Sequence, residues 1–390
     1  MTGVLYRQDL DEVRTRLRLW WHGEDIGRPV MKITAPGEKP VEMIDEMPRP
    51  AQWQTDYSTS DFDYRVFLAR QACNQTYYIG EAVPWVSPDL GPGCLSLYLG
   101  CEAKEEKDTV WFEPFLEGTE EARFPYNPDN FYWCFTLQLT EAIQRIGRGK
   151  FLLHFPDLIE GLDTLAAMRG TEELLMDMIS KPDWVHACLR EITDRYFHYY
   201  DVLYDRIRDE QGGSCFWIWA PGRMSKLQCD FSAMIGPDMF RDFMGPVLRE
   251  MTERLSYSMY HWDGPGALPH LDCLLELPQL DMIQWVPGAG AELPDDRRWW
   301  PLYHRMVEAG KRPLIHYCWG EGSLLAMFIQ HPFILQTAST VPATFTSSES
   351  CPFSCSSSVS YSMAPSASMG SPKCCWAVAE ARPKANNVKI

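Results

Sequence analysis

The chain alternates between short apolar runs and longer segments in which apolar residues recur at helical spacing. The first helical pattern covers residues 6 to 22 and is followed by Gly23, which predicts an amphipathic helix that packs on one end of the fold. The next segment, Arg28 to Pro36, is apolar and β-branched and ends in a Pro/Gly loop, as a strand would.

This rhythm continues along most of the chain. Eight apolar runs are candidate strands, and they begin at Arg28, Glu81, Phe151, Cys215, Ser258, Met282, Pro313 and Phe333. Helical patterns lie between them, most clearly from Thr171, across 185–207 and from Pro237. Strands that alternate with helices pair in parallel, and eight such units close most simply into a (β/α)8 TIM-type barrel of class α/β. An open doubly wound sheet is the alternative, although no GxGxxG or GxxxxGK[ST] motif follows an early strand.

Three segments are expected on these grounds. Residues 1–27 form an N-terminal helix packed on the barrel, and residues 28–341 form the barrel itself. An insert from Leu99 to Arg123 is predicted to be a hairpin. Residues 342–390 are rich in Ser, Cys and Pro and show neither helical nor strand periodicity, which predicts a disordered or frame-shifted tail.

Composition narrows the function classes. A formal net charge of -17 would repel phosphate backbones, so nucleic acid is not an expected partner. No apolar run of about 18 residues and no basic, apolar start is present, so we expect neither a membrane span nor secretion. Thirteen cysteines, an odd number in a long chain, fit reduced thiols in the cytoplasm. The sequence leaves the oligomeric state open.

Ionisable and aromatic groups gather where the predicted strands end, which in a parallel barrel is the mouth that holds active sites. The candidate site residues are Asp89, His154, Asp157, Trp217, Arg223, Tyr260, His261, Asp263, Trp285, His316 and Cys318. Most of them are candidates for binding a small-molecule substrate, and Asp89, His261 and Asp263 are the candidate catalytic groups.

Two x-spaced pairs suggest a metal site. His261 and Asp263 alternate along one strand and therefore face one side, and His316 and Cys318 repeat that geometry. Nitrogen, oxygen and sulfur donors suit zinc. The alternative is that these groups only hydrogen-bond one another inside the barrel.

Two further residues have equally open roles. Asp89, before a glycine-containing loop, either binds a ligand or caps a helix. Arg223 either clamps a substrate carboxylate or phosphate or forms a surface ion pair.

Three segments, 161–185, 229–251 and 260–290, resemble the uroporphyrinogen decarboxylase-like superfamily, whose strand ending in HxCG appears here as HWDG. The resemblance implies a (β/α)8 barrel with one of two activities. One is cofactor-free decarboxylation of the acetate arms of uroporphyrinogen, and the other is zinc-dependent methyl transfer between a corrinoid and a thiol.

The sequence departs from both patterns. TAPGEKP stands where the decarboxylases have the arginine loop RQAGRY, which argues against haem biosynthesis, although Asp89 matches their substrate-binding aspartate. In the methyltransferase pattern His261 is retained, whereas Asp263 replaces the zinc-binding cysteine. The third family cysteine is not found in FILQTAS, and Cys318 is its candidate substitute.

The resemblance therefore favours a metal-dependent methyltransferase that acts on a small thiol, with methylcobalamin or a corrinoid protein as methyl donor. A decarboxylase or other lyase that uses Asp89 and Arg223 is the alternative. A barrel that binds a ligand without catalysis is the third possibility.

Overall fold

The computed structural model describes residues 3–107, 109–119, 121–288, 290–319 and 323–328, and for residues 317–328 it describes the backbone alone. The helices are α1 (Leu10–Trp21), α2 (Phe62–Asn74), α3 (Cys94–Leu99), α4 (Phe131–Gly147), α5 (Gly161–Arg169), α6 (Thr171–Ser180), α7 (Pro182–Ile207), α8 (Pro237–Arg254), α9 (Leu271–Leu275) and α10 (Trp300–Glu308). Three 3-10 turns lie at η1 (Asp230–Met234), η2 (Pro265–His270) and η3 (Arg297–Trp299).

Seven strands form one sheet in the order β2-β1-β13-β12-β11-β10-β9. Their bounds are β1 (Val30–Pro36), β2 (Thr76–Gly80), β9 (Met224–Gln228), β10 (Tyr257–Asp263), β11 (Met282–Val286), β12 (Arg312–Trp319) and β13 (Ser323–Phe328). The four strands from β9 to β12 are parallel, whereas β13, β1 and β2 join the sheet in antiparallel pairs.

Six further strands form three two-stranded sheets. β3 (Trp85–Val86) and β6 (Leu152–Leu153) are parallel, whereas β4 (Glu102–Glu106) with β5 (Thr109–Glu113), and β7 (Ser214–Phe216) with β8 (Ile218–Ala220), are antiparallel. The β4–β5 pair confirms the hairpin predicted within the insert. Within the described ranges the chain is a mixed α/β fold, in which no closed ring of strands is detected.

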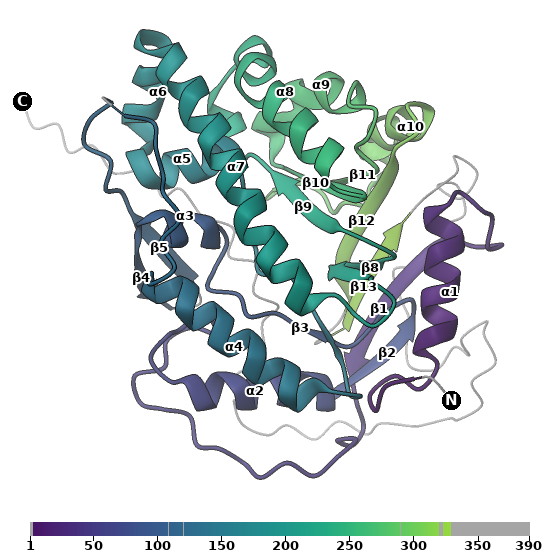
Figure 1. Cartoon of the computed structure of the whole chain (residues 1–390). Helices are drawn as coiled ribbons and strands as arrows, with labels where there is room; N and C mark the ends of the chain where they lie inside the picture. The colour runs from purple at the N-terminus through teal and green to yellow at the C-terminus, as the bar shows by residue number, and fades with distance from the viewer. Residues whose placement is uncertain (1–2, 108, 120, 289, 320–322, 329–390) are drawn as a thin grey trace, which may run out of the picture.

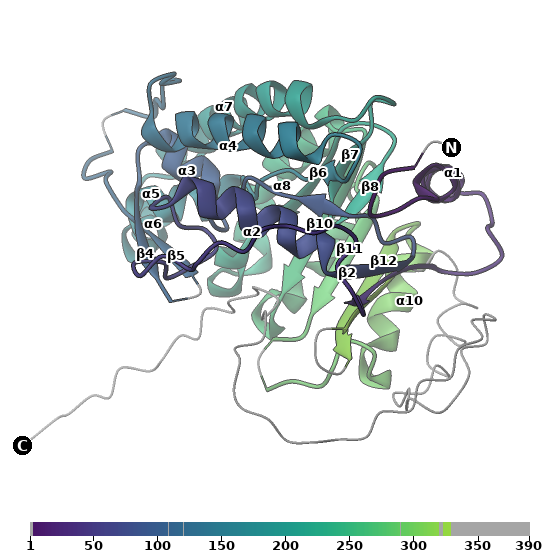
Figure 2. The ribbon, with the colours of Figure 1, turned by 90° about the horizontal axis from the view of Figure 1, so that it is seen from below.

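Helices cover the sheet and the short strands. In Figure 1 the long α7 crosses the molecule diagonally, with α8 and α9 above it and α4 and α2 below it. Figure 2 shows α4 alongside α7 and α10 beside β12, and the residues of each pair are in contact. The buried side of α7 carries apolar residues three or four apart, as its sequence predicted, because that spacing repeats each helical turn.

Helix α1 lies against the amino ends of the strands. The Trp21 indole donates to the carbonyl of Trp219 at 3.0 Å, and the Arg312 guanidinium donates to the carbonyl of Trp21 at 3.1 Å. Arg312 begins β12, so α1 packs at the amino end of that strand.

One predicted strand is wrong. Residues 215–220 form a hairpin, because Trp217 adopts a left-handed backbone (φ 58) and turns β7 back along β8. The strand that pairs with β10 is β9, which the sequence prediction did not include. β13 was also not predicted, and it fills the place between β12 and β1. The predicted eighth strand at 333–339 and the tail 342–390 lie outside the described residues.

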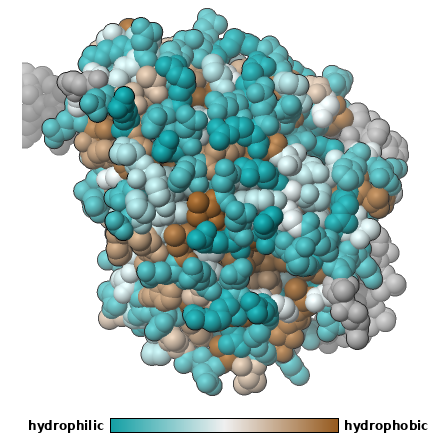
Figure 3. All heavy atoms as spheres, viewed as in Figure 1, coloured by the Kyte–Doolittle hydropathy of each residue, from teal (hydrophilic) through white to brown (hydrophobic). Residues whose placement is uncertain are grey.

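The face of the molecule seen in Figure 3 is largely polar. Figure 3 shows mainly hydrophilic residues on one face, with small apolar patches between them. Across the described ranges no helix combines the length and apolar character that a membrane crossing requires.

Candidate functional site

A row of polar side chains crosses one face of the sheet near the carboxyl ends of β9, β10 and β11. The strand register places His261 beside Gln228 on one side and Gln284 on the other. Register partners in parallel strands face the same side, so these three residues share a face with Asp263, two positions beyond His261. The predicted pair on β10 is thus part of a continuous polar layer.

Asp230, His261 and Asp263 form the group best suited to hold a metal ion. One ligand atom from each lies within 4.8 Å of the others. Asp230 is exposed and the other two are partly buried, so the group opens toward solvent. Asp263 Oδ1 is buried and no described residue hydrogen-bonds it. An orphaned buried carboxylate oxygen is costly, and a cation removes that cost, so these residues fit a divalent ion.

A hydrogen-bonded chain continues from this group across the sheet. His261 Nδ1 lies 2.6 Å from Gln284 Oε1, and Gln284 Nε2 lies 3.1 Å from His316 Nδ1. Burial and the charge of Lys226 lower the pKa of His261, and burial lowers the pKa of His316 to about 4. Both imidazoles are therefore neutral near pH 7, the form in which a ring nitrogen can ligate a metal or accept a hydrogen bond.

Lys226 is the buried cation of the cluster. Its ammonium donates to Asp157 Oδ2 at 2.7 Å and to Gln228 Oε1, and Gln228 Nε2 donates to Asp230 Oδ2 at 3.1 Å. Lys226 is 2% exposed, so its charge acts in a poorly solvated place. Asp157 Oδ1 is a second buried oxygen without a hydrogen bond from any described residue.

Trp217 forms a wall of the cluster. Its ring centroid lies 5.8 Å from that of His261, and the Lys226 ammonium lies 5.8 Å from the same ring. The backbone N–H of Trp217 donates to His154 Nε2 at 2.7 Å, and the backbone carbonyl of Trp217 accepts from Lys32 Nζ at 2.8 Å. These two bonds hold the unusual left-handed backbone that directs the indole toward the cluster.

His154 is linked to this cluster through the backbone of Trp217. Its Nδ1 lies 2.5 Å from the carbonyl of Phe155, and Nε2 accepts the Trp217 N–H, so both ring nitrogens have partners. Burial lowers its pKa to about 3, which keeps the ring neutral. We therefore assign His154 to holding Trp217 in place, although the sequence suggested contact with substrate.

Asp89 is linked to the cluster through the backbone of Asp157. Its Oδ1 accepts the backbone N–H of Asp157 at 3.2 Å and the thiol of Cys94 at 3.2 Å. Burial and the nearby charge of Asp157 raise the pKa of Asp89 to about 6. Asp89 thus supports the loop that carries Asp157.

The structure places three predicted site residues elsewhere. Arg223 lies before β9, where its guanidinium pairs with Asp201 at 2.5 Å and its carbonyl accepts from Tyr257, the first residue of β10. It is thus at the amino end of the strands, because the strand expected to end before it is a hairpin. Its surface ion pair was the alternative that the sequence left open.

Tyr260 and Trp285 face away from the cluster. Tyr260 precedes His261, and successive strand residues point to opposite faces. Trp285 is paired in register with Trp262, and their rings lie 4.5 Å apart. Trp285 also packs on Trp299 at the start of the α10 region, so both predicted substrate contacts belong to the layer between sheet and helices.

Cys318 lies in β12 opposite Leu324, and its side chain is outside what the structure describes. The third potential metal ligand, beside His261 and Asp263, is Asp230. The sequence did not predict Asp230, Lys226, Gln228 or Gln284 as site residues. The signal for β9 was present, since Met224 and Leu227 are apolar whereas Lys226 and Gln228 are polar, but the predicted strand lies at 215–222, before β9.

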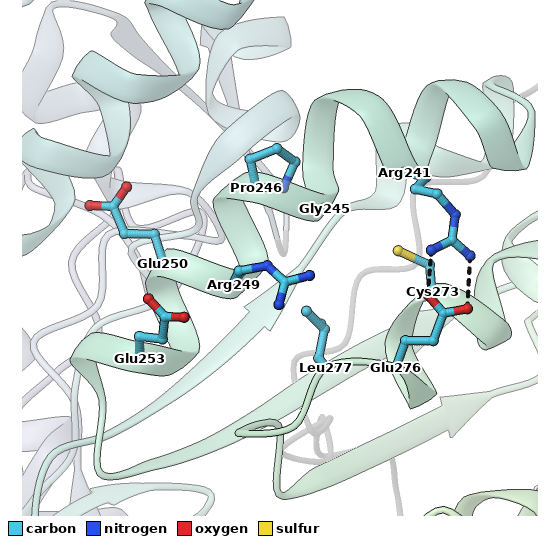
Figure 4. A pocket seen from close by; sticks show the side chains of 9 residues that line it. All are labelled: Arg241, Gly245, Pro246, Arg249, Glu250, Glu253, Cys273, Glu276 and Leu277. Atoms are coloured by element: carbon cyan, nitrogen blue, oxygen red, sulfur yellow. Dashed lines mark hydrogen bonds and ion pairs between the residues drawn. The ribbon is translucent and has the colours of Figure 1, made fainter.

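A surface groove lies apart from this cluster. It is bounded by α8 and α9 and lined by Arg241, Arg249 and Glu276 among others, and Figure 4 shows Arg241 directed at Glu276. None of the cluster residues lines it, so the groove has no evident part in the candidate chemistry.

Comparisons with protein-family models and with curated proteins find no match to this chain.

Proposed function

We propose that the chain is a metal-dependent enzyme that transfers a methyl group to a small thiol, with its active site at the carboxyl ends of β9 and β10. The observation that carries this proposal is the convergence of Asp230, His261 and Asp263, with a buried Asp263 oxygen that has no described hydrogen-bond partner. The resemblance of HWDG to the methyltransferase motif points to the same two positions on β10.

The proposal includes a (β/α)8 barrel. Support comes from neighbouring elements outside the main sheet: β3 pairs with β6, and the backbone N–H of Phe155, after β6, donates to the carbonyl of Cys215 in β7. β7 packs on β9, which begins the parallel strands. This order follows the chain, as in a barrel.

Zinc is the ion of this proposal, because it accepts imidazole and carboxylate donors. Asp230, His261 and Asp263 would hold it, and a fourth position would remain for substrate. Bound zinc would lower the pKa of a substrate thiol, which is about 8.5 when free. Oxygen donors are harder than thiolates, so this site would make a stronger Lewis acid than one with the family cysteine.

The chain's own residues would orient the thiol and limit water. The Trp217 ring would cover one side, and Lys226 with Asp157 would bound the other. A methylcorrinoid, whether free methylcobalamin or bound to a corrinoid protein, would supply the methyl group to the thiolate sulfur. The electron pair of the broken carbon–cobalt bond would stay with the corrinoid, and the thiol proton would pass to solvent.

Metal analysis of the purified protein, followed by a spectral titration with methylcobalamin and a thiol, tests the proposal. We expect bound zinc and thiol-dependent loss of the methylcobalamin spectrum. His261→Ala should remove both, whereas His22→Ala, at an exposed histidine in the C-cap of α1, should change neither. A wild-type protein that neither retains zinc nor gains thermal stability when zinc is added would refute this function.

A metal-independent lyase is the second candidate, and Lys226 favours it. It is the cation that the cluster offers to a substrate carboxylate, a role that the sequence had given to Arg223. In this case loss of carbon dioxide from a small acid would persist in His261→Ala and fail in Lys226→Met, without any effect of a chelator.

A further inference from the structure

Gln284 stands between two histidines and connects them by opposite ends of one amide. It is 1% exposed and lies on β11, between β10 and β12. Its oxygen is 2.6 Å from His261 Nδ1 and its nitrogen is 3.1 Å from His316 Nδ1. Such an amide has a direction, because its oxygen only accepts and its nitrogen only donates.

That direction decides where His261 carries its proton. With the amide oxygen toward His261, Nδ1 must donate and therefore keeps the proton, and Nε2 has the lone pair. A half-turn of the amide would present its nitrogen to His261, force Nδ1 to accept and move the proton to Nε2. Only the first arrangement lets His261 ligate a metal through Nε2.

His316 supplies the reason for the first arrangement. The amide nitrogen lies 3.1 Å from its Nδ1, so Nδ1 accepts from that nitrogen when His316 carries its own proton on Nε2, and this bond holds the amide oxygen toward β10. We propose that His316 and Gln284 act as positioning residues, in which His316 sets the direction of the Gln284 amide and the amide fixes the proton of His261 on Nδ1.

The consequence for metal binding rests on the proposed function, but the position of the proton does not. Nuclear magnetic resonance of protein labelled with ¹⁵N-histidine reports which ring nitrogen is protonated, with or without zinc. We expect the Nδ1–H form of His261 in the wild type, with its signals identified by their loss in His261→Ala. In His316→Phe the Nε2–H form should appear. His316→Asp, whose carboxylate oxygens only accept, should restore the wild-type pattern.

A double-mutant cycle separates direction from general disturbance. In Gln284→Glu the introduced carboxylate accepts at both ends, so it has no wrong direction. His316→Phe should therefore weaken zinc binding about tenfold in the Gln284 background, a usual size for loss of an outer-sphere partner. In the Gln284→Glu background the same change should leave the zinc affinity nearly unaltered.

The outcomes are distinct. Equal losses of zinc affinity in both backgrounds, or an Nε2–H form of His261 in the wild type, would overturn the proposed roles of His316 and Gln284. If zinc does not bind to any variant, the metal-dependent function fails. The histidine spectra of the wild type, His316→Phe and His316→Asp would then still test the proposed roles of His316 and Gln284.

Discussion

The two faces of β10 and β11 are built from adjacent residues and yet have opposite character. His261, Asp263 and Gln284 lie on one face, where polar groups meet and a buried carboxylate oxygen has no described hydrogen-bond partner. Trp262 and Trp285 lie on the other face, are buried and pack on each other. The face with the tryptophans resembles a core, and the polar face resembles a ligand-binding site.

The difference shows which residues serve stability and which serve chemistry. Trp262 and Trp285 are closely packed, so replacing one of them should lower the free energy of unfolding. The carboxylates on the polar face repel one another, so replacing one of them should weaken ligand binding and raise the free energy of unfolding. The experiments below exploit this contrast, beginning with the largest effect.

Trp262→Ala should lower the free energy of unfolding by about 3–5 kcal/mol, because it empties a large buried site. Trp262 is 1% exposed, and its indole donates to the carbonyl of Ala267 at 2.7 Å. Urea unfolding measures the loss. Trp111→Ala, at a half-exposed position on β5, is the matched control and should cost far less. Similar losses in both variants would contradict the assignment of Trp262 to the core.

Asp263→Asn should have the reverse effect in metal-free protein. It removes one of two neighbouring negative charges and should stabilise the fold by on the order of 1 kcal/mol. It should also abolish the rise in melting temperature with zinc, a rise that corresponds to about 2.7 kcal/mol when zinc is at a hundred times its dissociation constant. Asp45→Asn, at an exposed loop residue, should keep the wild-type response to zinc. A zinc response that survives in Asp263→Asn would remove Asp263 from the site.

Glu160→Gln should change how stability depends on pH. Glu160 is fully buried, Oε1 accepts the N–H of Gln228 at 3.0 Å, and burial raises its pKa well above the usual value. A raised folded-state pKa gives stability that is complete below the unfolded pKa, near 4.3, and is lost as pH rises toward the folded pKa.

Glu160→Gln leaves His261, Gln284 and His316 in place, so pH-dependent unfolding of this variant tests the effect of burial alone. The variant should become more stable than the wild type as pH rises from about 4.3 toward neutrality, and equal to it at lower pH. Glu12→Gln, at an exposed position of α1, should show no such difference. A wild-type-like pH profile for Glu160→Gln would mean that Glu160 ionises normally.

Arg223→Gln should have the smallest effect. Arg223 forms a partly exposed ion pair with Asp201 and lies over the ring of Tyr200, so its loss should cost no more than about 1 kcal/mol. Zinc binding and methyl transfer should be unchanged, because Arg223 is at the amino end of β9. Loss of activity in folded Arg223→Gln would return this residue to the site.

Much of the local structure could be predicted from periodicity. The long helix α7, the helix α8 and the strands β10, β11 and β12 follow from apolar spacing, and the x-spaced pair on β10 followed from strand alternation. The 215–220 hairpin could not be predicted, because its apolar residues suit a buried strand and only the left-handed Trp217 reverses the chain. That error displaced β9 and with it Lys226, Gln228 and Asp230.

The sequence by itself determined which residue types alternate along each strand, and hence that His261 and Asp263 share a face. Only the tertiary structure decided which face that is, that Asp230 joins the pair, and that Gln284 connects His261 to His316. The reason is physical: alternation is fixed by local backbone geometry, whereas strand order and register depend on packing between residues distant in the chain.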